Sequence, residues 1–226
     1  MKGDLWGIYG CGGCGRGIMP LAREMLRRHG HDPEGLVFID DEAPNLPERV
    51  NGHRVFTYAE FRAHAADRKF AGIAVAGGET RARLAAAFDA DGIGPWTVVA
   101  SNIVIMDDVE ILPGALISPF VTLTSNLRIG RHFHCNLYSY VEHDCRIGDF
   151  VTFGPGAKCN GNVVIEDFAY IGSGAVIRQG QPGKPLVIGR GAVVGMGAVV
   201  TKDVPAGVTV AGNPARQLTK PFADQQ

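Results

Sequence analysis

The sequence has almost no net charge, few cysteines and no long apolar segment. Its 22 lysine and arginine residues nearly balance 23 aspartate and glutamate residues, so no strong field favours nucleic acid or an anionic membrane as a partner. The 5 cysteines are odd in number and scattered, which argues against the disulfide framework of a small secreted domain. No apolar run approaches the roughly 20 residues of a membrane span, and the segment MKGDLWGIYG lacks the pattern of a secretory signal. We therefore expect a cytoplasmic protein that binds a small molecule, with neither nucleic acid nor a membrane as partner.

Residues 1–96 alternate between strand and helix signals. Short apolar runs bounded by glycine, proline and aspartate predict strands, and longer segments with apolar residues at helical spacing predict helices. Such alternation is typical of a parallel sheet covered by helices, so we expect a small Rossmann-like α/β domain. The predicted strands are 5–9, 36–39 and 70–76, and the predicted helices are 18–29, 58–66 and 79–88.

The rest of the chain has a period of six. From Val99 to Ile177 every sixth residue is apolar, and a second small or apolar residue follows four positions after most of them. The register fails at 180–185 (GQPGKP) and resumes at Ile188, which indicates an extruded loop. A hexad fits neither an α-helix nor a plain strand, but it suits a triangular β-helix with three hexads per turn. We expect this domain to span 97–208 and a tail to span 209–226.

Four segments resemble a known group of enzymes: YGCGGCGR, VEHDCRIGD, GAKCNGNV and VGMGAVVTKDVPAGVTVAGNPAR. They resemble hexapeptide-repeat acyltransferases, and within these the nucleotide-sugar N-acetyltransferases of the PglD and perosamine N-acetyltransferase type, with the related NeuD-like sialic acid O-acetyltransferases. The resemblance implies a left-handed parallel β-helix and a homotrimer. It also implies acetyl-CoA as cosubstrate, no metal, and a nucleotide-linked 4-amino-4,6-dideoxy sugar as acceptor.

His143 is the candidate general base. It comes two positions after the inward residue Val141, so its side chain points out of the core, and it is flanked by Glu142 and Asp144. Either carboxylate could hold the imidazole tautomer and stabilise the cation that forms when the ring takes a proton. A surface turn histidine is the alternative from the residues alone. The resemblance places the catalytic histidine of the family at this position.

Gly161 follows His143 by one coil of eighteen residues. Adjacent strands lie about 4.8 Å apart, so we expect the backbone N–H of Gly161 to be uncovered beside the base and to serve as an oxyanion donor. A turn glycine required by its dihedral angles is the other interpretation. The resemblance assigns this glycine to contact with the thioester.

The resemblance also implies contacts with coenzyme A. They would come from the inserted loop at Gly180, from the AGNPAR segment and from the position of a second family histidine, which is a threonine here. That replacement predicts a shifted sugar or nucleotide specificity. The implied residues are Gly161, Thr152, Gly180, Asn213, Pro214 and Arg216.

The sugar nucleotide is expected in the first domain. Gly10, Gly12 and Gly15 form G-x-G-x-x-G between a strand and a helix, where backbone N–H groups can hold a phosphate. An acidic residue at the end of the second strand could bind a ribose or base. NAD would also fit this pattern, but the short domain and the acyltransferase repeats favour a nucleotide sugar. The expected contacts are Gly12, Gly13, Cys14, Arg16, Asp40, Asp41 and, from the family alignment, Asn136, which could instead be a turn former.

Several alternatives remain at this level. One alternative is a zinc site of the γ-carbonic anhydrase type, which would use His132, His134 and His143. Their positions within the hexads differ, so the three side chains are not expected to meet at one ion. Cys11 and Cys14 form C-x-x-C, which we interpret as small packing residues of the glycine-rich loop. The chain could also O-acetylate sialic acid or another glycan hydroxyl. Outside enzymes, it could be a scaffold or a nucleotide sensor.

Overall fold

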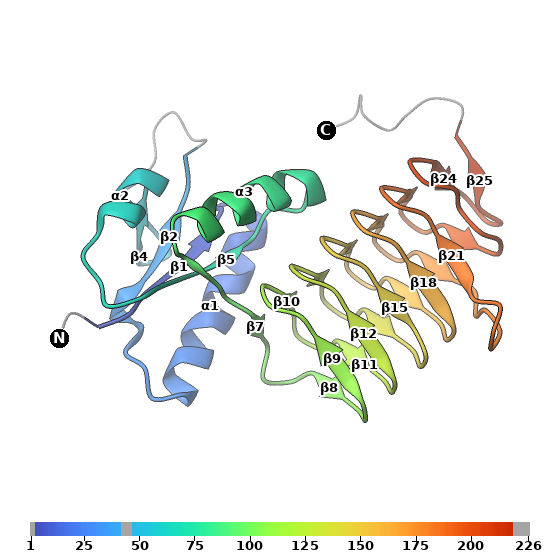
Figure 1. Ribbon diagram of the computed structural model, residues 1–226, viewed down its shortest axis with the longest axis horizontal. Helices are drawn as coiled ribbons and strands as arrows, with labels where there is room; N and C mark the ends of the chain where they lie inside the picture. The colour runs from blue at the N-terminus through green and yellow to red at the C-terminus, as the bar shows by residue number, and fades with distance from the viewer. Residues whose placement is uncertain (1–2, 42–46, 219–226) are drawn as a thin grey trace. The chain divides into compact units, whose positions relative to one another are not determined.

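The structure is a computed structural model, which describes residues 3–41 and 47–218 (Figure 1). The chain divides into two compact units. The first comprises the residues up to 101 together with 113–116, and the second comprises 102–112 and the residues from 117 on. The sequence-based boundary at 96 thus lies slightly before the division that the contacts make.

The first unit is a mostly parallel sheet in the order β3-β4-β2-β1-β5-β6. Its strands are β1 (Leu5–Tyr9), β2 (Leu36–Ile39), β3 (Arg49–Val50), β4 (His53–Phe56), β5 (Lys69–Ile73) and β6 (Gly94–Pro95), followed by β7 (Val98–Val99). Its helices are α1 (Gly13–Arg28), α2 (Tyr58–Ala63) and α3 (Gly78–Ala90), with a single 3₁₀ turn, η1, at Pro33–Gly35. Parallel pairing of β1 with β2 and β5 is as expected from the strand-helix alternation, whereas the β3–β4 hairpin is antiparallel and was not predicted.

Helices cover both faces of this sheet because successive side chains of β1 point to opposite sides. Ile8 is fully buried in one apolar cluster with Ile18 and Met19 of α1. On the other face, Tyr9 contacts the ring of Phe88 in α3, with 6.0 Å between centroids. The sheet and its helices therefore form three layers that carry the glycine-rich loop at the end of β1.

The second unit is a parallel β-helix. In Figure 1 its coils stack one on the next from β8 to β25, and three sheets run along it in the orders β25-β24-β22-β19-β16-β13-β10, β23-β20-β17-β14-β11-β8 and β21-β18-β15-β12-β9. Its strands are β8 (Val104–Ile105), β9 (Val109–Ile111), β10 (Leu116–Ile117), β11 (Thr122–Leu123), β12 (Leu127–Ile129), β13 (His134–Cys135), β14 (Tyr140–Val141), β15 (Arg146–Ile147), β16 (Thr152–Phe153), β17 (Lys158–Cys159), β18 (Val163–Ile165), β19 (Tyr170–Ile171), β20 (Val176–Ile177), β21 (Leu186–Ile188), β22 (Val193–Val194), β23 (Val199–Val200), β24 (Thr209–Ala211) and β25 (Arg216–Gln217).

The strand register confirms the hexad pattern. Val141 pairs with Cys159, so one coil takes 159 − 141 = 18 residues. Ile165 pairs with Ile188, and 188 − 165 = 23, so five residues are extruded between these strands. The insertion is an exposed turn closed by a bridge between Gln181 and Lys184. The loop thus leaves the stacking of the coils intact.

Two parts of the repeat differ from the expectation. Ile105, an inward position of the hexad, is 46% exposed because β8 is the edge strand of its sheet. At the other end, 209–211 form β24, which pairs in parallel with β22, and β25 returns antiparallel to β24. The first part of the predicted tail is thus a further strand of the β-helix, while 219–226 lie outside the described residues.

The stacked interior should carry much of the stability. Phe153 is fully buried and meets Phe133 edge-on at 5.3 Å between ring centroids. Phe153→Ala should lower the free energy of unfolding by about 3–5 kcal/mol, because it leaves a cavity in the coil interior. Phe120→Ala is the matched control, since that ring is 53% exposed, and it should cost less than about 1 kcal/mol. Urea unfolding followed by circular dichroism measures both, and equal losses would contradict a continuous core.

Candidate active site

His143 stands at the corner where the chain leaves β14. Its Nδ1 lies 2.8 Å from Oδ2 of Asp144, and the two side chains are 47% and 48% exposed. An ionised carboxylate can only accept hydrogen bonds, so Nδ1 must carry the proton. In the neutral imidazole this leaves the lone pair of Nε2 available, which is the state that a general base requires.

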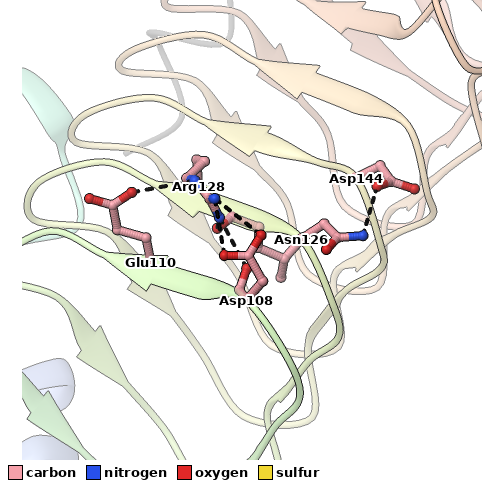
Figure 2. Close-up of polar contacts among 6 residues, drawn as sticks. Asp108, Glu110, Asn126, Arg128 and Asp144 are labelled. Carbon is pink, nitrogen blue, oxygen red and sulfur yellow. Dashed lines mark hydrogen bonds and ion pairs between the residues drawn. The ribbon is translucent and has the colours of Figure 1, made fainter.

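The carboxylate of Asp144 is held at both oxygens. Oδ2 accepts from the imidazole. Oδ1 accepts from Nδ2 of Asn126 at 3.1 Å, as Figure 2 shows. The hydrogen bond from His143, followed by that from Asn126, lowers the pKa of Asp144 below its ordinary value. Asp144 therefore stays ionised and keeps the imidazole in one tautomer.

Gly161 lies against the imidazole, one coil further on. A Cβ built on Gly161 would lie 2.6 Å from Cε1 of His143 and 2.7 Å from its Nε2. The backbone bond from the N–H of Asn162 to the carbonyl of His143, at 3.0 Å, holds the two corners together. Only glycine leaves room for the ring in this position.

Two details differ from the sequence-based expectation. The N–H of Gly161 is not uncovered, because it donates to Oε2 of Glu142 at 3.2 Å. Glu142 therefore contacts the predicted oxyanion donor, whereas the imidazole donates its described hydrogen bond to Asp144. Of the two carboxylates that the sequence left open, Asp144 is the one that orients His143. An oxyanion could reach the N–H of Gly161 only in place of the Glu142 carboxylate.

The inserted loop leaves from the same corner, two coils beyond His143. The N–H of Gly180 donates to the carbonyl of Gly161 at 2.9 Å, so Gly180 continues the row that begins with His143. Beside the loop lies a cavity whose charged lining residues are three cations, Arg178, Lys184 and Lys202, and one acid, Asp203. These cations were not predicted from the sequence. A lysine within the insertion was the one available signal.

The AGNPAR segment forms the exposed turn between β24 and β25. Ala215 donates its N–H to the carbonyl of Val199 in β23 at 2.8 Å, so the turn borders the sheet that contains β14. Asn213, Pro214 and Arg216 are exposed there. β23 is three strands from β14, or about 14 Å at a strand spacing of about 4.8 Å. An extended ligand could reach from this turn to His143 along one corner.

Thr152 and Asn136 lie elsewhere on the coil. Thr152 is buried in β16, which belongs to the sheet of β13 and β19, and not to the sheet of β14. Asn136 donates from Nδ2 to the carbonyl of Phe153 at 2.7 Å, which ties neighbouring coils together. The corner of His143 therefore brings together Glu142, Gly161 and Gly180, but not these two residues.

In the first unit, the glycine-rich loop is held open at the N-terminus of α1. Asp40 accepts from the N–H of Cys11 at 2.8 Å, and a Cβ on Gly15 would lie 1.7 Å from the carbonyl oxygen of Gly10. These close contacts fix the loop. By contrast, a Cβ on Gly12 or Gly13 would meet no atom within 4 Å. The exposed start of a helix of this length is a suitable place for a phosphate.

The other residues predicted to contact the nucleotide lie near this loop. Cys14 and Arg16 lie exposed in the first turn of α1. Asp41 accepts from the N–H of Tyr58 at 2.8 Å, at the start of α2, so one of its oxygens has a structural use. Both Asp40 and Asp41 follow β2 at the edge of the sheet where the glycine-rich loop lies.

The described residues contain neither a metal-ligand cluster nor a membrane-spanning helix. In residues 3–41 and 47–218 no three histidine, cysteine or acidic side chains gather in the manner of a metal site. His132 and His134 are buried in the β-helix. Cys11 and Cys14 are free thiols. No helix in the described part of the chain has the length and apolar character needed to cross a membrane.

A parallel β-helix with a carboxylate-held histidine at one corner places the chain in the class of hexapeptide-repeat acyltransferases. No protein-family model matches the sequence. GDP-perosamine N-acetyltransferase of Escherichia coli O157:H7 is 49% identical over 217 residues, which are 96% of this chain and 97% of that protein. The chain belongs to the family of nucleotide-sugar N-acetyltransferases that includes this enzyme.

Solved structures agree with this assignment. WeeI from Acinetobacter baumannii AYE superimposes with a TM-score of 0.91 at 53% identity, over 95% of this chain and 100% of that one. The acetyltransferase domain of PglB from Neisseria gonorrhoeae FA1090, in complex with acetyl coenzyme A, gives a TM-score of 0.81 at 27% identity, over 96% and 100%. The likeness therefore extends over both units.

The contact between Gly161 and His143 can be tested by adding one methyl group. Gly161→Ala should displace the imidazole and lower acetyltransferase turnover by roughly 100-fold, since a displacement of about 1 Å at a reacting group can cost that much. Gly17→Ala is the matched control, because a Cβ there meets no atom within 4 Å, and it should leave turnover unchanged. Near-normal turnover of Gly161→Ala with a normal melting temperature would contradict the contact.

Proposed function

We propose that the protein transfers the acetyl group of acetyl-CoA to the amine of a GDP-linked 4-amino-4,6-dideoxy sugar of the perosamine type. The relative at 49% identity, which matches nearly the whole chain, bears the name of this reaction. The observation that carries the proposal is the imidazole of His143, fixed at Nδ1 by Asp144 and lying on Gly161.

In the proposed mechanism His143 acts as general base. Nε2 takes a proton from the sugar amine as its nitrogen forms a bond to the thioester carbonyl carbon. Asp144 stabilises the imidazolium that results. The tetrahedral intermediate then collapses with cleavage of the carbon–sulfur bond, and the imidazolium returns the proton to the departing thiolate. The products are the N-acetylated sugar nucleotide and free coenzyme A.

The oxyanion of the intermediate needs a hydrogen-bond donor. The N–H of Gly161 lies beside the imidazole and suits this role once Glu142 yields the position. Glu142 would then act as a stand-in for the oxyanion in the free enzyme. Because a carboxylate and an oxyanion compete for one donor, this exchange would accompany the binding of the thioester.

The proposed place of acetyl-CoA is the corner between His143 and the AGNPAR turn. Gly180 continues the row of the site, and Arg178, Lys184 and Lys202 offer three cations for the phosphates. Asn213, Pro214 and Arg216 would border the far end of the ligand. Thr152, at the position of the family's second histidine, lies on another sheet of the same coil, so a neighbouring copy would have to bring it near the site.

That separation supports an active site shared between copies. We therefore propose a cytoplasmic homotrimer of left-handed β-helices, with one site at each of its three contacts. Asn136 would approach the sugar from the neighbouring copy.

We propose that the first unit is a Rossmann-like domain and that it binds the sugar nucleotide. Its diphosphate would lie at Gly12 and Gly13, where the N-terminus of α1 is open, with Cys14 and Arg16 beside it. Asp40 and Asp41 would face the ribose or the base at the end of β2. No metal takes part in these steps.

The mechanism predicts that His143→Ala loses about 10²- to 10⁴-fold in kcat, which is the usual contribution of a general base. Affinity for coenzyme A and the melting temperature should stay unchanged. For the wild-type enzyme kcat/KM should fall as the pH drops, since a protonated imidazole cannot accept a proton. The assay follows release of coenzyme A with GDP-perosamine as acceptor, and with UDP-linked and dTDP-linked amino sugars and sialic acid in parallel.

His29→Ala is the control, because His29 is an exposed histidine at the C-terminal end of α1, and it should be as active as the wild type. If the His143→Ala enzyme were active, His143 would not be the general base. A preference for sialic acid would change the acceptor to a hydroxyl, and failure of acetyl-CoA to raise the melting temperature would favour a scaffold.

The cations beside the inserted loop predict a separate effect on the cosubstrate. Lys202→Ala should raise the KM for acetyl-CoA by roughly 10- to 100-fold, because one hydrogen bond to a charged group contributes about 1.5–3 kcal/mol. The KM for the sugar nucleotide should not change. Lys69→Ala, in β5 of the first unit, serves as the control for loss of a lysine. A rise in the KM of the sugar nucleotide alone would place the cosubstrate elsewhere.

A further inference from the structure

We infer that Asn126 is a positioning residue for the general base, acting through Asp144. The observation is the row Asn126–Asp144–His143, in which the amide holds one carboxylate oxygen and the imidazole holds the other. This inference rests on the proposed role of His143 and adds to the site a residue that lies one coil before Asp144.

The backbone places Asn126 directly beneath Asp144. The corner positions of four successive coils all have left-handed backbones, with φ of 53° at Asp108, 60° at Asn126, 59° at Asp144 and 58° at Asn162. Asparagine and aspartate tolerate this conformation better than other residues with a Cβ. The N–H of Asp144 donates to the carbonyl of Ser125 at 3.1 Å, which locks the two corners in register. Equal backbones one coil apart therefore place the two side chains next to each other.

Asn126 has a carboxylate on each side along this row, and an ion pair decides between them. Below it, Arg128 donates to both oxygens of Asp108, at 3.0 and 3.1 Å, and its Nε lies 3.4 Å from Glu110. Figure 2 shows Arg128 bound to these two acidic residues, while the amide of Asn126 points to Asp144. Because Asp108 is engaged by a guanidinium, the amide of Asn126 remains available to Asp144.

A second anchor matters because the site is accessible to water. His143 and Asp144 are both about half exposed, 47% and 48%, so a carboxylate held only by the imidazole could rotate and bond to solvent instead. With Oδ1 held by Asn126, rotation would break two bonds. The amide thus keeps Oδ2 aimed at Nδ1 and keeps Nε2 facing the substrate.

Asn126→Gly tests the anchor without straining the turn. Glycine adopts a positive φ at no steric cost, so the variant removes the side chain without straining the backbone. We expect kcat to fall about 3- to 10-fold, as for loss of roughly one hydrogen bond, with both KM values unchanged. Asn51→Gly makes the same change at a left-handed residue, φ 49°, in the turn between β3 and β4, and should keep the wild-type kcat.

Asn126→Asp provides a readout that a merely structural role would not move. The new carboxylate would stand beside Asp144, where the amide now lies, and added negative charge near the site favours the protonated imidazole. The acid limb of the kcat/KM profile should therefore shift to higher pH, whereas in Asn126→Gly the fall in kcat should persist at the pH optimum.

The outcomes separate the two proposals. If both Asn126 variants keep the wild-type kcat and pH profile while His143→Ala is inactive, the inference about Asn126 is overturned and the base remains. If His143→Ala is active, the assignment of His143 as general base is wrong, and so is the inference about Asn126. Melting temperatures near that of the wild type show that each variant is folded, and should Asn126→Gly fold poorly, the pH profile of Asn126→Asp alone decides.

Discussion

The geometry of the site depends on one constraint, the return of the chain to the same place after every eighteen residues. Each inward residue stacks on the one a coil earlier, as Cys159 does on Val141. The interior thereby fixes the register of the residues that face outward. His143 and Gly161 meet for this reason, and so do Asn126 and Asp144. An extra residue that was not extruded as a loop would shift the corner of its coil and separate the pair that spans it.

The left-handed backbone at the corner is a second feature on which the site depends. Neighbouring residues of an extended chain point in opposite directions, and an imidazole would not normally bond to the carboxylate of the next residue. At Asp144 the chain turns with φ of 59°, which brings the carboxylate round to Nδ1. Glu142, on the other side of His143, precedes the turn and instead reaches the N–H of Gly161 across the coil.

The eighteen-residue register and the left-handed corner explain how much of the structure could be predicted from the sequence. A period of six is visible in the residues, so the β-helix, the extruded loop and the stacking of Gly161 on His143 followed from counting. The partner of each carboxylate did not, because both flank the histidine and only the corner dihedral angles distinguish them. The cations of Arg178 and Lys202 were missed since they are far apart in sequence and come together at the cavity only through the coil. In the first unit the glycine pattern indicated the loop, but the short β3–β4 hairpin lacks a strong periodic signal.

The extruded loop has a consequence for how such an enzyme can change. Its five additional residues lie outside the stacked lattice, and Ile165 still pairs with Ile188 across them. Length and charge at 180–185 are thus mechanically decoupled from the coils that hold the imidazole. Under the proposed function, substitutions in this loop could therefore alter recognition of the acyl carrier without moving the imidazole.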